Sequence, residues 1–408
     1  MNKKLGSTLL VAGTMIGAGM LAMPLTSAGI GFTWTVILLL ALWLLLTYSA
    51  LLFVEVFQTT DSEASIGTLA GQYFGKWGKI VTNIVLLVFL YALLAAYIAG
   101  GGGIVAQQVA NLQGVESAGD GLKIVSAVVF TLIFGGFVAI STKVVDAVNR
   151  LLFVAMLVAF ALVLVLMLPK LSLGYLLEMP LDYALLVSAS PVFFTSFGFH
   201  GSIHSLNRYL EGNVAALRGS VVMGSLITLA GYIVWQLATH GVLSQATFTE
   251  IITQKPNLQG LVEAIRVVTG SNVVAGAVAL FSALALITSF LGVALGLLEC
   301  LDDLLVKSCN KRLNRLVLSV MTFLPSLLFV LFYPEGFIKA LGYAGQMFAF
   351  YAVVLPAALA WQVRKKHPNL PYRVKGGYAA LLVSAVLGLI IVHVPFLIKW
   401  DWLPAVIG

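Results

Sequence analysis

The sequence predicts an integral membrane protein built from α-helices. Of its 408 residues, 60% are hydrophobic and only 10% are charged, whereas a soluble domain carries about 25% charged residues. These charges are too few to form the polar surface of a soluble protein of this length. Runs such as VILLLALWLLL lack the alternation of apolar and polar residues that marks membrane-barrel strands, so the spans are expected to be helical.

Charge-free windows predict eleven spans, because a helix needs about 20 apolar residues to cross a bilayer. The first window, Leu5–Val54, is too long for one helix, and the segment SAGIGFTW divides it into two. The remaining windows are Ile80–Val115, Ile124–Thr142, Leu151–Pro169, Tyr183–Asn207, Gly219–Thr249, Val267–Leu298, Leu316–Pro334, Ala340–Val363 and Gly376–Ile398. The longest connection, near Gly241–Asn272, is expected to hold one short surface helix.

The distribution of lysine and arginine predicts the orientation of these spans. With a cytoplasmic N-terminus, 17 of the 23 basic residues fall in inner segments and 6 in outer ones, as the positive-inside rule requires. The C-terminus is then periplasmic, and the net charge of +7 needs no nucleic-acid partner. Cys300 and Cys309 lie on one inner flank, where a disulfide is not expected. The first span is expected to be retained rather than cleaved.

This orientation also predicts an internal repeat. Helices 1 to 5 begin inside and helices 6 to 10 begin outside, which is the arrangement of an inverted repeat with an eleventh helix added. We therefore expect a single membrane domain over residues 1–408, with a first repeat at 5–170, a second at 183–363 and the last helix at 376–400.

Two spans contain residues that interrupt a helix. The first holds VAGTMIGAGMLAMPL, with Gly17 and Gly19, and the sixth holds SPVFFTSFGFHGS, with Pro191 and Gly198. Matched interruptions in the two halves are a pointer to a transporter's binding site. Unwound backbone cannot face lipid, so it should face a cavity. There the N-terminus of a half-helix suits a carboxylate and a C-terminus suits an ammonium group.

The first interruption has two alternative interpretations. GAGMLA fits the dinucleotide-binding pattern of glycines, but it lacks the preceding strand that this pattern requires. Gly13 and Gly17 also form a GxxxG pair, which can serve only to pack helices together. A second interruption at the equivalent place in the sixth span favours the binding site.

The segments GTMIGAGMLAMPL, FTSFGFHGS, TSFLGVALGLL and ALGYAG resemble those of the hydroxy and aromatic amino acid permeases, a family of the amino acid–polyamine–organocation superfamily. The resemblance extends from Leu5 to about Trp402. It implies a five-plus-five inverted repeat, with broken helices 1 and 6 surrounding the amino acid. It also implies a bacterial inner-membrane location and uptake of tyrosine or a related aromatic amino acid coupled to protons. Tryptophan, phenylalanine and serine/threonine remain alternative substrates.

The resemblance also assigns substrate contacts. They are Thr14, Ile16, Gly17, Ala18, Gly19 and Met20 in the first break, and Thr195, Ser196, Phe197, Gly198, Phe199 and His200 in the second. An aromatic substrate needs a wide apolar pocket with stacking partners, for which Phe194 and Tyr91 are candidates. Many of the 24 Phe and 13 Tyr must instead face lipid or fill the core. The partner of a substrate hydroxyl stays open among Asn83, Thr195, Ser196, His200 and Ser282.

Few ionisable residues lie within the spans, and such residues are candidates for function. His200 is the first candidate for handling a proton, with a neutral, carbonyl-bonded histidine as the alternative. Glu55 and Glu299 are further candidates, although both can be interfacial residues. Sodium-coupled relatives of this fold place a hydroxyl pair on helix 8, which Thr288 and Ser289 match, so sodium coupling stays open. Back-bonding of these hydroxyls to their own helix is the plain alternative.

Other classes of function are disfavoured. Some proton-coupled relatives carry a lysine on helix 5, but LLFVAMLVAFALVLVLML has none. His200 and His204 have metal-ligand spacing without a third ligand, so we expect neither a metal nor another cofactor. An enzyme would need clustered His, Asp, Glu or Cys in adjacent spans, a channel would need a polar pore, and a sensor would need a signalling domain.

Overall fold

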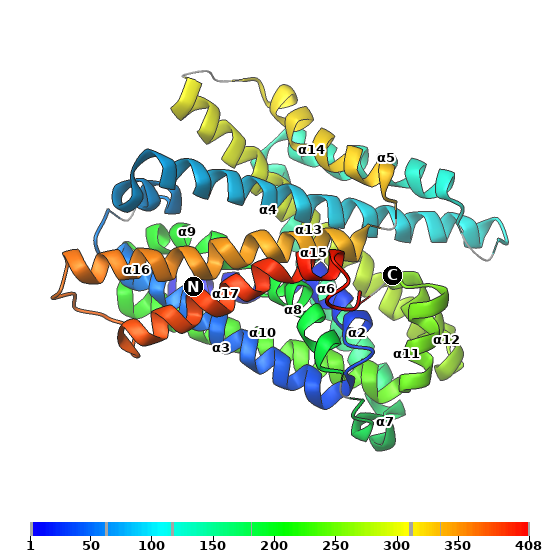
Figure 1. Cartoon of the computed structure of the whole chain (residues 1–408). Coiled ribbons are helices and arrows are strands. Elements are labelled where there is room, and N and C mark those ends of the chain that lie inside the picture. The colour runs from blue at the N-terminus through cyan, green and yellow to red at the C-terminus, as the bar shows by residue number, and fades with distance from the viewer. Residues whose placement is uncertain are drawn as a thin grey trace.

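The protein is described by a computed structural model that covers residues 3–61, 64–115, 118–180, 182–309, 313–334 and 336–406, without the side chains of 307–309. Every regular element in these ranges is a helix. Figure 1 shows long helices running across the molecule, with the short helices α7 (Leu173–Leu177), α11 (Gln245–Gln254) and α12 (Leu258–Thr269) gathered at one end. The all-helical class is as predicted.

The predicted number of spans is confirmed. Ten helical segments in the described ranges are long and apolar enough to cross a membrane, and a bent pair of helices makes an eleventh. The bent pair is α1 (Lys3–Met15) with α2 (Ala18–Thr26). The other spans are α3 (Gly31–Phe57), α4 (Ile66–Leu112), α5 (Asp120–Ile140), α6 (Thr142–Met167) continued by η1 (Leu168–Lys170), α8 (Tyr183–Ser196) continued by η2 (His200–Ser202) and α9 (Ile203–Tyr209), α10 (Val214–Val242), α13 (Asn272–Cys309), α14 (Arg315–Phe332), α15 (Phe337–Ala349) continued by η3 (Phe350–Val354) and α16 (Leu355–Lys366), and α17 (Gly377–Lys399).

Several boundaries differ from the prediction, and the start of the third span differs most. It begins at Ile66 rather than Ile80, and α4 is kinked at Gly75, whose φ is 69°. The fifth span also begins earlier, at Thr142 rather than Leu151, and the eighth ends later, at Cys309 rather than Leu298. Charged residues precede Ile80, so a charge-free window detects only the part of α4 beyond them. The connection after α10 holds two helices instead of one. Ser244 accepts a hydrogen bond from the amide of Thr247 and thereby starts α11 soon after α10 has ended at Val242.

Short polar side chains fix where several helices begin. Ser141 accepts from the amide of Val144 and separates α5 from α6 by a single residue. Asn213 and Asn314 accept from the amides of Ala216 and Val317 in the same way, at the starts of α10 and α14. Such caps satisfy amides that have no partner within the helix.

Burial separates a central group of helices from an outer one. In their most apolar windows, the spans at Tyr183–Tyr209 and Phe337–Lys366 are 67% and 72% buried. The corresponding shares for α5, α14 and α17 are only 33%, 28% and 28%. Figure 1 shows α5 and α14 beyond α4 on one side of the molecule. The sixth span therefore lies at the centre with the tenth, and apolar outer helices surround them.

A buried ion pair joins α3 to the last two spans. Arg364 Nε and Nη2 donate to the two carboxylate oxygens of Glu55 at 2.7 and 2.8 Å, and the amide of Val374 donates to the same carboxylate at 2.8 Å. Arg364 Nη1 also donates to the carbonyl of Gly377 at 2.8 Å. Glu55 is 0% exposed and Arg364 is 5% exposed. Glu55 was a candidate for ion coupling, and its carboxylate here binds a structural arginine.

We predict that Glu55→Gln lowers the stability of the protein strongly, because it leaves a buried guanidinium without its counter-ion, at a cost of about 3–5 kcal/mol. Thermal unfolding in detergent measures the effect. Glu263→Gln, which breaks the exposed pair with Arg266, is the matched control and should change little. The double variant Glu55→Leu/Arg364→Met should unfold at a higher temperature than Glu55→Gln. Equal loss in all the Glu55 variants would contradict this role for the ion pair.

Candidate functional site: two helix breaks in contact

The first span is broken at the predicted place. α1 ends at Met15 and α2 begins at Ala18, and the two axes meet at 47°. Gly17 is extended, with φ 177° and ψ −148°. The carbonyl of Met15 thus lies at the C-terminal end of one half-helix, and the amides of Ala18 and Gly19 lie at the N-terminal end of the other.

The sixth span is also broken where predicted. α8 ends at Ser196, and helical structure resumes only at His200 in η2 and then in α9. The amide of Phe199 donates to the carbonyl of Phe197 at 2.9 Å, which is a tight turn rather than a helix. The carbonyl of Ser196 therefore lies at a second C-terminal end.

The two breaks touch one another. α2 packs along α8, and a Cβ atom placed on Gly19 would lie 2.8 Å from Ser196 Oγ and 2.9 Å from Ser196 Cα. A Cβ on Gly17 would collide with Ser289 Oγ of α13. Only glycine at position 19 allows the backbones of α2 and α8 to approach this closely, and glycine at position 17 leaves room for the side chain of Ser289.

Two side chains of α10 hold the breaks together. The hydroxyl of Tyr232 lies 2.7 Å from the carbonyl oxygen of Met15 and 2.6 Å from that of Ser196. One turn further, Trp235 Nε1 donates to the carbonyl of Met20 at 2.9 Å. Tyr232 and Trp235 are fully buried. Sequence reasoning missed both, although GYIVWQL places a tyrosine and a tryptophan on one face of the seventh span.

The predicted hydroxyl pair lies beside the first break. Ser289 Oγ accepts from the amide of Ala18 at 3.1 Å and caps α2. Thr288 Oγ1 lies 2.9 and 3.1 Å from the carbonyls of Leu284 and Ala285 in its own helix, which is the back-bonded alternative. It also lies 3.7 Å from Met156 Sδ of α6, so the group of the fifth span beside Thr288 is a thioether. Within the described ranges, no three His, Cys, Asp or Glu side chains gather as metal ligands.

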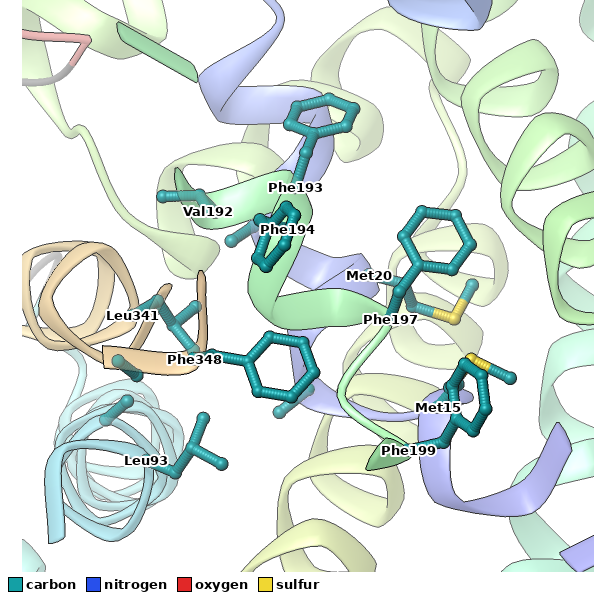
Figure 2. Close-up of a cluster of buried hydrophobic side chains, with 14 of the residues drawn as sticks. Met15, Met20, Leu93, Val192, Phe193, Phe194, Phe197, Phe199, Leu341 and Phe348 are labelled. Atoms are coloured by element: carbon teal, nitrogen blue, oxygen red, sulfur yellow. The ribbon is translucent and has the colours of Figure 1, made fainter. Parts of the chain in front are cut away.

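Aromatic rings surround the breaks. Phe348 of α15 stacks on Phe89 of α4 with a centroid distance of 5.0 Å, and Phe194 meets Phe348 edge to face at 5.5 Å. Phe197 meets the ring of Tyr232 at 5.2 Å. In Figure 2, Phe348 and Leu93 lie on one side of the α8–α9 connection, and Phe197 and Phe199 lie on the other with Met15 and Met20. These rings are buried and could present π-faces to an aromatic side chain.

His200 lies in the second break but is bonded to α3. Its Nε2 atom lies 2.9 Å from Ser49 Oγ and 3.1 Å from the carbonyl oxygen of Leu46. The ring is fully buried and packs against Phe199 and Phe348, with centroid distances of 4.7 and 5.3 Å. This geometry is that of a neutral, carbonyl-bonded histidine, which is the alternative to a proton-handling role.

Other predicted site residues divide into two groups. Ala18, Gly19, Met20, Thr195, Ser196 and Phe199 are buried at the breaks, and Ile16 and Gly198 are partly buried there. Thr14 lies one residue before the end of α1, at the first break, with its side chain exposed. The structure does not bring two others to this region. Glu299 is exposed towards the C-terminal end of α13, and the hydroxyl of Tyr91 donates to the carbonyl of Met321 in α14 at 2.8 Å.

The arrangement suits a zwitterion. Carbonyls at helix C-termini carry partial negative charge, and amides at an N-terminus carry partial positive charge. Here the C-terminal carbonyls of α1 and α8 lie within reach of one tyrosine hydroxyl, and the N-terminus of α2 lies beside them. Such a site can hold an ammonium group and a carboxylate without any charged side chain. Broken spans that meet at the centre of a helical bundle define a class of membrane transporters.

Comparison with known proteins gives the family. Residues 1–395 match the model of the tryptophan/tyrosine permease family, and the chain belongs to this family. It is 61% identical, over the full length of both chains, to tyrosine-specific transport system 1 of Haemophilus influenzae. It is 53% identical to tyrosine-specific transport system 2 of the same organism, over 100% of this chain and 99% of the relative. Identity to the tryptophan-specific transport protein of H. influenzae is 35%, over 91% and 90% of the two chains.

We predict that Gly19→Ala destabilises the protein and abolishes uptake, because the added methyl group meets the backbone of Ser196. Overpacking of this kind costs about 1–3 kcal/mol. Thermal unfolding and uptake by cells measure both effects. Gly231→Ala in α10 is the matched control, since a Cβ there meets no atom within 4 Å. Normal stability and uptake in Gly19→Ala would show that α2 and α8 do not need this close contact.

Proposed function

We propose that this protein is a secondary active transporter that imports tyrosine by proton symport. The observation that carries the proposal is the contact between the two helix breaks, where the carbonyls of Met15 and Ser196 converge on one point. The ammonium of the amino acid binds there, and its carboxylate binds at the N-terminus of α2. Two relatives that are 61% and 53% identical bear the name of tyrosine-specific transport systems, which supports tyrosine as the substrate.

The substrate's ring is proposed to lie among the aromatic residues beside the second break. Phe194 of the broken span meets Phe348 of α15 on one side of the α8–α9 connection, and Phe197 and Phe199 lie on the other side. Phe194 and Phe348 already meet edge to face, a geometry that an aromatic ligand can extend at favourable energy. These rings move to admit the ligand. The remaining residues of the two breaks are proposed to contact the substrate because they lie beside the same site.

Transport is proposed to occur by alternating access in the bacterial inner membrane, with the N-terminus cytoplasmic and the C-terminus periplasmic. Residues 5–170 and 183–363 act as inverted repeats, and rocking of one against the other exposes the central site to each side in turn. His200 remains the first candidate for the proton, and Thr288 and Ser289 are the candidates if sodium is the coupling ion.

The experiment is uptake of labelled tyrosine by purified protein in liposomes. We expect an inward proton gradient without sodium to drive accumulation above equilibrium, and a proton ionophore to abolish it. An excess of unlabelled tyrosine should compete more strongly than tryptophan, phenylalanine, serine or threonine. Accumulation that requires sodium would overturn proton symport and make Thr288 and Ser289 the first candidates for binding the ion. Accumulation of another of these amino acids instead of tyrosine would overturn the substrate.

A further inference from the structure

The hydroxyl of Tyr232 faces two carbonyl oxygens at once. It lies 2.7 Å from the oxygen of Met15 and 2.6 Å from that of Ser196, and both distances are those of strong hydrogen bonds. A tyrosine hydroxyl has a single proton to donate, and a carbonyl oxygen can only accept. One donor therefore serves two acceptors, and neither carbonyl receives a full hydrogen bond of its own.

Both carbonyls lie where the helix provides no partner. Met15 is the last residue of α1 and Ser196 is the last residue of α8, so these oxygens belong to the unpaired group that every helix C-terminus leaves. Tyr232 itself is 0% exposed, and its ring packs edge to face on Phe197 at 5.2 Å. Water is thus kept from this point, and an unpaired carbonyl here carries the full penalty of a buried polar group.

An ammonium group would satisfy the same two oxygens better, because it has three protons to donate. After each delivery, the empty binding site of a symporter must also reorient to face the outside again. In that half of the cycle no ammonium is present, and the two carbonyls still need a donor.

Resting on the proposed function, we propose that Tyr232 is a positioning residue that replaces the substrate's ammonium when the transporter is empty. Its hydroxyl holds the C-terminal ends of α1 and α8 together, so that the empty site can close and change its orientation. When an amino acid binds, its ammonium has enough protons to donate to both oxygens, so the hydroxyl of Tyr232 is no longer their sole donor. The ammonium can replace the hydroxyl at these oxygens because the hydroxyl has only one proton and cannot satisfy both of them.

This role separates two kinds of transport. Exchange of external for internal tyrosine uses only the loaded protein, whereas net uptake also needs the return of the empty protein. Tyr232→Phe keeps the ring and removes the donor, so it should impair only the empty step. A residue that merely stabilised the fold would affect both kinds of transport alike, and a residue that only bound substrate would raise the KM of both.

The test compares Tyr232→Phe with the unaltered protein in liposomes. Labelled tyrosine is supplied outside, and the interior holds either buffer or unlabelled tyrosine. We expect net uptake into buffer to fall by about tenfold, as the loss of one buried hydrogen-bond donor implies, and exchange to stay within about threefold. Tyr73→Phe is the matched control, because it also removes a hydroxyl bonded at 2.8 Å, to Thr59, far from the breaks. It should change neither rate.

Each other outcome overturns the proposal. An equal loss of exchange and net uptake in Tyr232→Phe, or no loss of either, shows that the hydroxyl has no special role in the empty protein. Failure of Tyr232→Phe to fold when it is extracted with millimolar tyrosine shows a purely structural role, since the ligand's ammonium should replace the missing donor. The unaltered protein distinguishes the role of Tyr232 from the proposed function. If the unaltered protein transports tyrosine, the proposed function stands whatever Tyr232→Phe does.

Discussion

The structure depends on one constraint, which is that backbone amides and carbonyls inside a membrane-spanning bundle must find partners within the protein. A continuous helix meets this constraint by itself, but a span interrupted at Gly17 or Phe197 does not. The protein supplies the missing partners from two neighbouring helices. Tyr232 and Trp235 of α10 serve carbonyls, and Ser289 of α13 serves an amide. The same groups that need partners are those that can recognise an amino acid's backbone.

Close packing follows from this arrangement. The partners can reach the breaks only if α2 lies directly against α8 and α13, and the glycines of the first break allow that approach. The outer helices complete the bundle without contributing to the site, and their exposed apolar surfaces face lipid. Away from the breaks, Glu55 and Arg364 join α3 to the link between α16 and α17. Within the described ranges, the side-chain bonds at the breaks and the buried Glu55–Arg364 pair thus join helices that lie far apart in the sequence.

The sequence predicts much of the fold because its strongest signals are local. Charge-free windows give the number of spans, and clustered glycine and proline give the positions of both breaks. The partners of the breaks could not be predicted, because nothing near Tyr232 in the chain shows that it crosses Met15 and Ser196. Glu55 and Arg364 are 309 residues apart, so their pairing depends on how distant helices pack. Tyr91 is a further example. Its aromatic side chain suits a substrate pocket, but the sequence does not show that its face of α4 packs against α14.

The central claim is that the two breaks form one site that binds both ends of a zwitterion. Competition by tyrosine analogues tests it most directly, with tyramine lacking only the carboxylate and 3-(4-hydroxyphenyl)propionate lacking only the ammonium group. The measurement is inhibition of labelled tyrosine uptake by each analogue at the same concentration. We expect tyrosine to inhibit fully and neither analogue to inhibit detectably, because each analogue leaves one end of the site unpaired. Inhibition by either analogue as strong as that by tyrosine would contradict it.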